Sequence, residues 1–417
     1  MGEPIIKVGI VTAQRIQFKL NAPYRCADND MAPNGTEQVE ATPTGLRWRG
    51  KVYHKLSFVP TDMSVCSFSL LDVTIGVGFH WERQELQTFR GTLCFLPTDG
   101  KVCAVNILPV EDYLCSVISS EMSPTASLEF LKAHAVISRS WLLAQIDKKE
   151  KSDRTACEIR RPGILLKWYE RDDHTLFDVC ADDHCQRYQG VTRVKNANAH
   201  EAISQTRGRV LTYDGDICDA RFSKCCGGRL ELFSSCWEDA DKPYLLSKSD
   251  IIYNDMRARE VKDAFCNTAD AAILSQVLNA YDQETHDFYR WTVAYTRQEL
   301  SQLVRQKSGI DFGLILDLRP VRRGPSGRIV QLEVVGTRQT LTVGKELEIR
   351  RWLSPSHLYS SAFEVEHTAE GFVLHGKGWG HGVGLCQIGA AVMGTLGYRY
   401  DEILQHYYPG ATLIQRY

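Results

Sequence analysis

One stretch of the chain, residues 111–146, constrains the fold most because its pattern predicts two consecutive helices. The first is expected from about Asp112 to Ser120, with an acidic residue in its first turn. The second is expected to begin with Ser123 as its cap and Pro124 as its first residue. Two apolar stripes cover most of its sides and predict a buried central helix. They consist of Leu128, Leu131, Ala135, Leu142 and Ile146, and of Phe130, Ile137 and Trp141.

Glu121 lies in the bend expected between these two helices. A helix that begins two residues later would hold this carboxylate in place, which is what a general acid requires. However, a glutamate in such a bend is more often a solvated residue or a helix cap. From the residues alone both interpretations stay open, whereas Glu129, on the second helix, is expected to be solvated.

Size and charge restrict the class of protein only broadly. A chain of 417 residues has room for about two or three domains. The formal net charge of −2 favours neither a nucleic acid nor an anionic membrane as a partner, and it is compatible with a neutral polysaccharide. No stretch resembles a membrane span, and residues 1–20 lack the basic start and apolar core of a signal peptide. We therefore expect either a cytoplasmic protein or a chain shortened at its N-terminus.

The rest of the pattern predicts an α+β fold with several domains. Short β-rich runs fill residues 1–87, interrupted by a loop expected from Asp28 to Gly45. Asp99-Gly100 predicts a hairpin turn, and a later helix is expected to end at Gly309. The expected domains are an N-terminal β domain (1–87), a core with the buried helix (88–254), an accessory α+β unit (255–370) and a Gly-rich C-terminal segment with helices that completes the core (371–417).

The segment HTLFDVCADDHCQRYQG, residues 174–190, is a candidate metal site. His174, Cys180, His184 and Cys185 fall within twelve positions, and thiolates and imidazoles are the usual ligands of tetrahedral zinc. A reduced loop with two ordinary cysteines is the alternative. Most of the earlier cysteines lie in apolar runs and are interpreted as buried thiols. Further thiols that compete for the metal are Cys218, Cys236 and the adjacent pair in KCC (224–226), which lacks the C-x-x-C spacing of a redox pair.

Glycine alternates with other residues in GKGWGHGVG, residues 376–384. If the segment is extended, all its glycines face one side, while Lys377, Trp379 and His381 face the other. The bare backbone would then admit a ligand or another chain. Trp379 can stack on a sugar ring and His381 can hydrogen-bond to one, or both can simply pack. A phosphate loop is disfavoured because its order of glycine, lysine and hydroxyl residues is missing.

Two strings resemble the hallmarks of the SpoIID/LytB family. They are LPVEDYLCSVISSEMSPTASLEFLKAHAVISRSW (108–141) and GKGWGHGVGLCQIGAAVMGTLGYRYDEILQHYYPGATL (376–413), and the resemblance covers about residues 88–417. The family comprises sporulation-stage peptidoglycan lytic transglycosylases and their amidase-enhancer relatives. The resemblance implies a lytic transglycosylase that cleaves MurNAc-GlcNAc strands with formation of 1,6-anhydro-MurNAc ends.

The resemblance also implies roles for particular residues. Glu121 would be the catalytic general acid and base, while His174, Cys180 and Cys185 would hold a structural zinc ion. Substrate binding would fall to Arg139, Ser223, Trp379, His381 and Gln387. The cysteines in KCC depart from the family pattern and put the role of Ser223 in doubt. The expected partners are peptidoglycan glycan strands and an N-acetylmuramoyl-L-alanine amidase. The family implies the cell envelope, the periplasm or the extracellular space, against the cytoplasmic location expected above.

A single carboxylate suits lytic cleavage, whereas ordinary glycosidases need two. The C6 hydroxyl of the sugar attacks C1 within the same residue, so that proximity replaces a second enzymic group. The alternative from a different class is a non-catalytic cell-wall-binding protein that enhances an amidase. A zinc-dependent hydrolase is less favoured because no H-E-x-x-H occurs.

Overall fold

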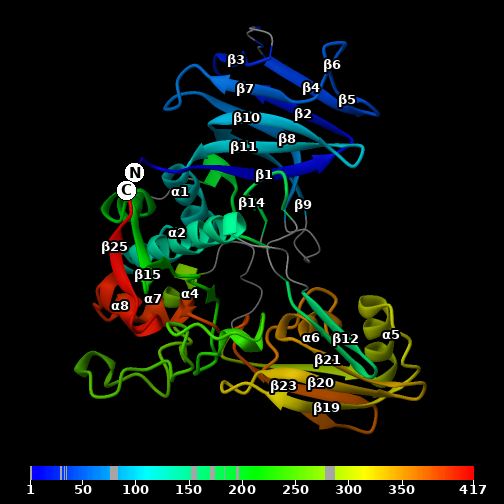
Figure 1. Cartoon of the computed structure of the whole chain (residues 1–417). Coiled ribbons are helices and arrows are strands. Elements are labelled where there is room, and N and C mark those ends of the chain that lie inside the picture. The colour runs from blue at the N-terminus through cyan, green and yellow to red at the C-terminus, as the bar shows by residue number, and fades with distance from the viewer. Residues whose placement is uncertain are drawn as a thin grey trace. The chain divides into compact units, whose positions relative to one another are not determined.

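The computed structural model describes residues 2–28, 31, 33, 35–75, 83–151, 157–169, 174–182, 184–193, 197–277 and 287–417 (Figure 1). The chain divides into two compact units. Unit 1 comprises residues 1–124, 171–209 and 415–417, and unit 2 comprises residues 125–170 and 210–414. Helices and several sheets occur together, which confirms the predicted α+β class. In the described segments, no helix combines the length and the apolar character that crossing a membrane requires.

Unit 1 contains two six-stranded sheets, in the orders β14-β1-β11-β10-β7-β3 and β6-β5-β4-β2-β8-β9. Strand β2 has the sequence RIQFKL and buries every second residue, as the alternation of side chains across a strand requires. The bounds are β1 Ile5–Ala13, β2 Arg15–Leu20, β3 Tyr24–Cys26, β4 Gly35–Thr42, β5 Gly45–Trp48, β6 Lys51–Tyr53, β7 Leu56–Pro60, β8 Ser67–Ile75, β9 Arg83–Arg90, β10 Thr92–Thr98, β11 Lys101–Pro109 and β14 Val179–Cys180.

Aromatic side chains from both sheets meet in the core of unit 1. The ring of Phe18 on β2 lies 5.1 Å from those of Phe58 on β7 and Phe95 on β10. Trp48 on β5 lies 5.2 Å from Phe58, edge to face. All four side chains are almost fully buried, so they join the two sheets through the apolar area that they remove from water.

In unit 1 the structure confirms one predicted turn and corrects one predicted loop. Asp99 and Gly100 both have positive φ between β10 and β11, which confirms the predicted hairpin turn. The loop expected from Asp28 to Gly45 is wrong over residues 35–42, which form β4. This strand pairs with β2 on one side and β5 on the other. Its polar sequence has little strand propensity, but two hydrogen-bonded neighbours outweigh that preference.

The helices of unit 1 are α1 (Val110–Glu121) and α3 (Ala197–Gln205), with a short 3-10 turn, η2 (Gly190–Arg193). The central helix of unit 2 is α2 (Leu128–Lys151). Its predicted burial is confirmed, but the predicted start at Pro124 is wrong. The hydroxyl of Ser127 accepts the N–H of Phe130, and its carbonyl accepts that of Leu131. Ser127 therefore satisfies free amides of the first turn, in place of Ser123.

Unit 2 contains the other four sheets of the described residues. Helix α5 (Arg297–Ser308) ends as predicted, because Gly309 stops it with φ of 74°. Its start is fixed by a capping box between Thr296 and Glu299. The sheets have the orders β12-β13-β21-β20-β19, β18-β23-β22, β16-β15-β25 and β17-β24. The bounds are β12 Glu158–Arg161, β13 Ile164–Lys167, β15 Arg209–Tyr213, β16 Asp216–Ile217, β17 Phe222–Ser223, β18 Arg290–Thr296, β19 Ile315–Arg323, β20 Ile329–Gly336, β21 Thr340–Gly344, β22 Phe363–His367, β23 Gly371–Lys377, β24 Leu385–Cys386 and β25 Thr412–Gln415.

The other helices of unit 2 are α4 (Ala271–Val277), α5 (Arg297–Ser308), α6 (Glu346–Trp352), α7 (Gln387–Thr395) and α8 (Tyr400–Tyr407), with η3 (Phe233–Ser235) and η4 (Met256–Ala258). Glu129 of α2 pairs with Lys132 at 2.6 Å and accepts the N–H of Tyr400 at 2.8 Å. It thus connects α2 to the start of α8, and the expectation that it is merely solvated is wrong.

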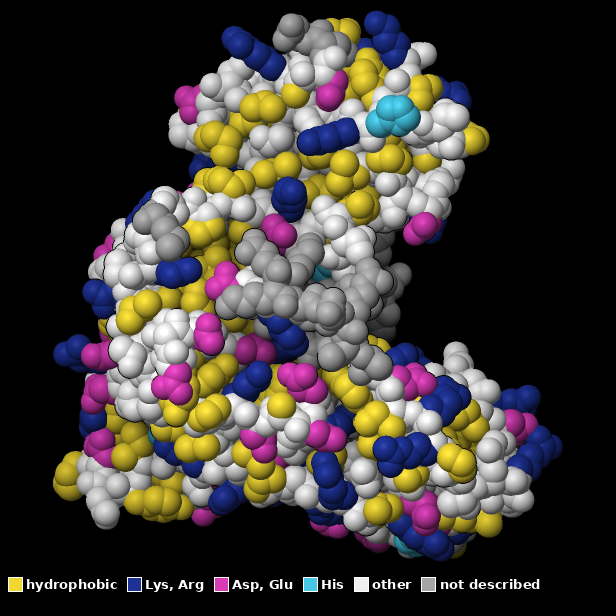
Figure 2. Space-filling view, viewed as in Figure 1, with side chains coloured by type: hydrophobic (Ala, Val, Ile, Leu, Met, Phe, Trp, Pro, Cys, Tyr) yellow, Lys and Arg dark blue, Asp and Glu magenta, His cyan; other side chains and the backbone are white. Residues whose placement is uncertain are grey.

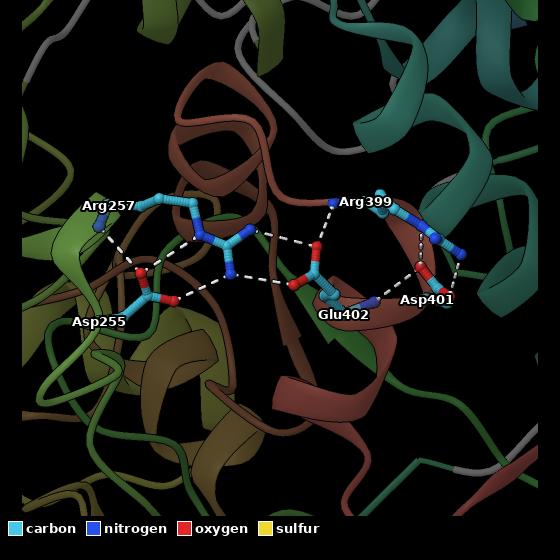
Figure 3. Close-up of polar contacts among 5 residues, drawn as sticks. All are labelled: Asp255, Arg257, Arg399, Asp401 and Glu402. Carbon is cyan, nitrogen blue, oxygen red and sulfur yellow. Dashed lines mark hydrogen bonds and ion pairs between the residues drawn. The ribbon is translucent and has the colours of Figure 1, made fainter.

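An ion-pair network joins the η4 segment to α8 (Figure 3). The guanidinium of Arg257 lies 2.9 Å from a carboxylate oxygen of Asp255 and 2.9 Å from one of Glu402. These groups are partly exposed, so the network contributes little to the free energy of unfolding. On the face shown in Figure 2, side chains of both charge signs are interspersed among the described residues, in keeping with the small net charge.

Candidate functional site

Glu121 is the last residue of α1, and its side chain is half-buried. The helix forms because Val110, Leu114, Val117 and Ile118 bury one apolar face in unit 1. Met122 leaves the helical conformation, and its N–H bonds to Ile118. The predicted catalytic carboxylate is therefore attached to a firmly packed helix end.

The segment after the candidate metal ligands packs along α1 in the same unit. The Tyr113 hydroxyl donates to the side chain of Gln186 at 3.2 Å, and the rings of Tyr113 and Tyr188 stack at 5.1 Å. The hydroxyl of Ser116 donates to the carbonyl of Gly190 at 2.8 Å and accepts the N–H of Gln189 at 3.2 Å. These contacts hold residues 186–190 beside the helix that carries Glu121.

Arg187 then lies close enough to bond directly to the carboxylate. Its backbone N–H donates to Oε1 of Glu121 at 3.2 Å. This bond holds one oxygen of the carboxylate against the backbone of the neighbouring segment. A pocket in unit 1 is lined by parts of β1 and β8 and by residues 180–182 and 187–189, so that it includes Arg187 but not Glu121.

The structure brings together all four candidate metal ligands of residues 174–185. One ligand atom from each of His174, Cys180, His184 and Cys185 lies within 4.8 Å of the others. The sulfur of Cys185 is 3.4 Å from Nε2 of His174 and 3.7 Å from Nδ1 of His184. Cys180 is fixed by the parallel pairing of β14 with β1. Two thiols and two imidazoles at this separation fit a tetrahedral zinc ion.

The electrostatic setting also fits a cation. A hydrogen bond from Cys185, with further ones from His174 and His184, lowers the pKa of Cys180 to about 2 despite its burial. Burial raises the pKa of Tyr113, and the nearby Cys185, Cys180 and Glu121 act in the same direction. Tyr113 is thus a neutral hydrogen-bonding group close to both the thiols and the candidate catalytic carboxylate.

Three of the residues expected to bind substrate are buried within unit 2. Arg139 on α2 is fully buried and donates to the carbonyl of Ala135 at 3.5 Å. The hydroxyl of Ser223 accepts the N–H of Gly382 at 3.1 Å. The side chain of Gln387 donates to Nε2 of His134 at 3.0 Å. Each of these residues has a structural partner in its own unit, and its role in binding stays a prediction.

Sequence reasoning missed His134, which is central to this buried polar group. Its Nδ1 lies 3.2 Å from the hydroxyl of Ser138, one helical turn further along α2. Burial, assisted by Lys224, lowers the pKa of His134 to about 3. Because the amide of Gln387 donates to Nε2, the neutral ring carries its proton on Nδ1. The sequence signal that could have revealed this group is a histidine and a serine four residues apart among the buried residues of α2.

The glycine-rich segment is not the extended strand expected from its alternation. Strand β23 ends at Lys377, and Gly378, Gly380, Gly382 and Gly384 have φ values between 71° and 89°. Glycine recurs there because the backbone of a residue with a side chain rarely adopts this left-handed conformation. The bare backbone is covered by the protein itself. A Cβ on Gly382 would lie 2.4 Å from the guanidinium of Arg328, which bonds to the carbonyl of Gly380.

Trp379 and His381 are the partly exposed members of the predicted binding group. The ring of Trp379 packs against Tyr359 at 4.5 Å and Phe288 at 4.9 Å. Nδ1 of His381 accepts the N–H of Val383 at 3.0 Å. Burial lowers the pKa of His381, and nearby arginines lower it further, so the ring is neutral. These contacts hold both rings in fixed positions.

Two sequence families match different parts of the chain. Residues 98–213 match the family described as Stage II sporulation protein (SpoIID), and residues 231–384 match a domain of unknown function (DUF8618). The first match spans α1, Glu121, α2 and all four candidate metal ligands. The second includes the whole glycine-rich segment, residues 376–384.

The chain also resembles curated proteins over most of its length. An uncharacterized protein of Brachyspira hyodysenteriae is 28% identical, over 78% of this chain and 72% of the relative. The amidase enhancer of Bacillus subtilis is 26% identical over 72% of this chain but only 40% of the relative. The stage II sporulation protein D of the same organism is 24% identical over 74% of this chain and 75% of the relative. The matching SpoIID domain and these relatives confirm the predicted resemblance to the SpoIID family.

Proposed function

We propose that this protein is a peptidoglycan lytic transglycosylase, with Glu121 as its general acid and base. Its relatives include an amidase enhancer and a stage II sporulation protein D, which supports a cell-wall-related role. The observation that carries the catalytic form of this role is the placement of Glu121. A half-buried carboxylate at a packed helix end, bonded by the Arg187 N–H, has the fixed position that proton transfer requires.

The proposed reaction uses one carboxylate twice. Protonated Glu121 gives its proton to the oxygen that links C1 of N-acetylmuramic acid to N-acetylglucosamine, and the C1–O bond breaks. The C6 hydroxyl oxygen of the same N-acetylmuramic acid bonds to C1, and its proton passes to the Glu121 carboxylate. The sugar ends as a 1,6-anhydro ring, no water is consumed, and the acid is restored. Proximity within one sugar replaces the second carboxylate of ordinary glycosidases.

We also propose that His174, Cys180, His184 and Cys185 bind one structural zinc ion. Four protein ligands close the coordination sphere, which is typical of structural rather than catalytic zinc. The ion would stabilise the loop whose continuation contains Arg187. Its contribution to catalysis would therefore be to keep that backbone N–H against Glu121.

A second candidate is a non-catalytic protein that binds the cell wall and enhances an amidase. The similarity to the amidase enhancer of Bacillus subtilis favours it. The aligned region covers only 40% of that relative, which is therefore much longer than the part that this chain matches. An enhancer would require a surface for an N-acetylmuramoyl-L-alanine amidase in addition to a glycan-binding surface.

Mass spectrometry of purified glycan strands separates these functions. The strands are incubated with the protein, both with and without their stem peptides. A lytic transglycosylase releases fragments with anhydro ends, which are lighter by one water than the products of hydrolysis. Ordinary reducing ends would contradict the lytic reaction, and unchanged strands together with faster cleavage by an added amidase would establish the enhancer.

A further inference from the structure

Four buried cysteines of unit 2 form a cluster that lies outside the candidate site of unit 1. They are Cys225, Cys226, Cys266 and Cys386, and at most 1% of each residue is exposed. The sulfurs of Cys226 and Cys266 are 3.5 Å apart. Burial raises the pKa of the Cys225 thiol well above its usual value, and the neighbouring thiol of Cys386 raises it further, whereas that of Cys266 lowers it. From the sequence, the KCC thiols were expected to compete for the metal site at residues 174–185, whereas the structure places Cys226 beside Cys266.

The surroundings of the cluster contain groups that support thiolates and their bound ion. The sulfur of Cys386 accepts the backbone N–H of Cys226 at 3.2 Å, a bond that stabilises a thiolate. Cys386 also lies at the N-terminus of α7, where the helix dipole favours negative charge. An oxygen of Asp250 lies within 4.8 Å of the sulfurs of Cys226, Cys266 and Cys386.

Asp250 already has hydrogen-bonding partners on both of its oxygens. One accepts the hydroxyl of Tyr407 at 2.7 Å and the other accepts the N–H of Cys266 at 3.0 Å. The same bond to Cys266 orients the cysteine. Outer carboxylates of this kind orient the residues that bind a metal directly. We therefore regard Asp250 as a supporting group and the four thiols as ligands.

We propose that Cys225, Cys226, Cys266 and Cys386 bind one zinc ion in the interior of unit 2. Four thiolates at tetrahedral positions form a common structural zinc site, with Zn–S distances of about 2.3 Å. Neighbouring sulfurs in such a site are about 3.8 Å apart. The 3.5 Å between Cys226 and Cys266 matches this spacing. An iron–sulfur cluster needs more room, because its inorganic core holds the cysteine sulfurs further apart.

The position of the site explains what the ion would do. Between Tyr213 and Arg290, the described residues contain only short elements, namely β16, β17, η3, η4 and α4. Long segments with so little regular structure seldom stay ordered without further constraints. Zinc would join the KCC segment, the Cys266 loop and the start of α7. Since Gln387 follows Cys386 directly and bonds to His134, it would also fix the family's C-terminal hallmark onto α2.

Zinc analysis of full-length protein purified without added metal tests this site. Cys266→Ser should lose about one zinc ion per chain relative to the parent. Cys218→Ser is the matched control, because Cys218 is equally buried in unit 2 but outside the cluster, and it should lose none. A parent-like zinc content in Cys266→Ser would overturn the proposal. This comparison holds whether or not residues 174–185 bind their own ion, so it is independent of the proposed function.

A second measurement does not depend on the folding of Cys266→Ser. Cys185→Ser disrupts the proposed site of unit 1 and leaves all four buried cysteines in place. X-ray absorption at the zinc edge should then show four sulfur neighbours at about 2.3 Å. Zinc-free protein, a shell dominated by nitrogen or oxygen, or a Cys226–Cys266 disulfide in unreduced protein would each overturn the proposal.

Discussion

At the scale of single residues, Glu121 is the critical test of the catalytic proposal. Glu121→Gln keeps the size of the side chain and an oxygen that can accept the Arg187 N–H, but it removes the transferable proton. Because general acid–base catalysis contributes about 10²- to 10⁴-fold, release of anhydro fragments should fall by that order. Glycan binding and the melting temperature should stay near those of the parent. The measurement is the rate of anhydro-end release by mass spectrometry.

The control for this variant is Glu201→Gln, an exposed glutamate on α3 in the same unit. Glu129 is less suitable, since it bonds to Lys132 and to the backbone of Tyr400. Cleavage by Glu201→Gln should match the parent rate. Equal rates for Glu121→Gln and the parent would show that another group transfers the proton.

His134 gives a residue-scale prediction about pH. Its folded pKa of about 3 lies below the ordinary histidine value of about 6.5, so the unfolded chain binds the proton more readily. The stabilising effect of the neutral ring is fully present above about pH 6.5 and is lost as the pH falls towards 3. One such group changes the free energy of unfolding by up to about 1.4 kcal/mol per pH unit. Denaturant titrations at several pH values in this range measure the free energy of unfolding. That free energy should rise less steeply with pH for His134→Gln than for the parent.

At the scale of elements, the glycine-rich segment can be tested by two matched alanine substitutions. Gly382 and Gly397 have similar φ values of 75° and 83°. A Cβ on Gly382 meets Arg328, whereas one on Gly397 meets nothing within 4 Å. Gly397→Ala should cost about 1–2 kcal/mol from backbone conformation alone. Gly382→Ala should cost about 1–3 kcal/mol more because the interior must shift. Equal losses in denaturant titrations would show that the contact with Arg328 is unimportant.

The same elements show where sequence reasoning succeeds. The end of α5 at Gly309 and the turn at Asp99-Gly100 were predicted correctly because each signal lies within a few neighbouring residues. The start of α2 was placed too early, since Ser123-Pro124 carries a local cap signal but the chain uses Ser127. The alternation of glycine was assigned to a strand because a period of two also arises from repeated left-handed residues.

At the scale of the whole molecule, local motifs predicted candidate functional groups but not the distant residues that contact them. Residues 174–185 were predicted as a metal site because the candidate ligands are close in sequence, and the structure places His184 beside the three residues implied by the family resemblance. The bond from Arg187 to Glu121 joins residues 66 positions apart. The cysteine cluster joins Cys226 to Cys386, 160 positions apart. Contacts of this range depend on the tertiary fold, and no spacing rule in one sequence reveals them.

Charge gives a prediction that belongs to the whole chain. The net charge is −2, and groups of both signs are interspersed on the face shown in Figure 2. Binding to glycan strands without stem peptides should therefore rest on stacking and hydrogen bonds, which salt screens weakly. Retention on immobilised strands should change little when sodium chloride rises from about 0.05 M to about 0.5 M. Strands that keep their acidic stem peptides are the control, because any repulsion from this chain should weaken at high salt. If retention on the bare strands falls steeply with salt, a local cluster of charged side chains, rather than Trp379 and the neutral His381, governs binding.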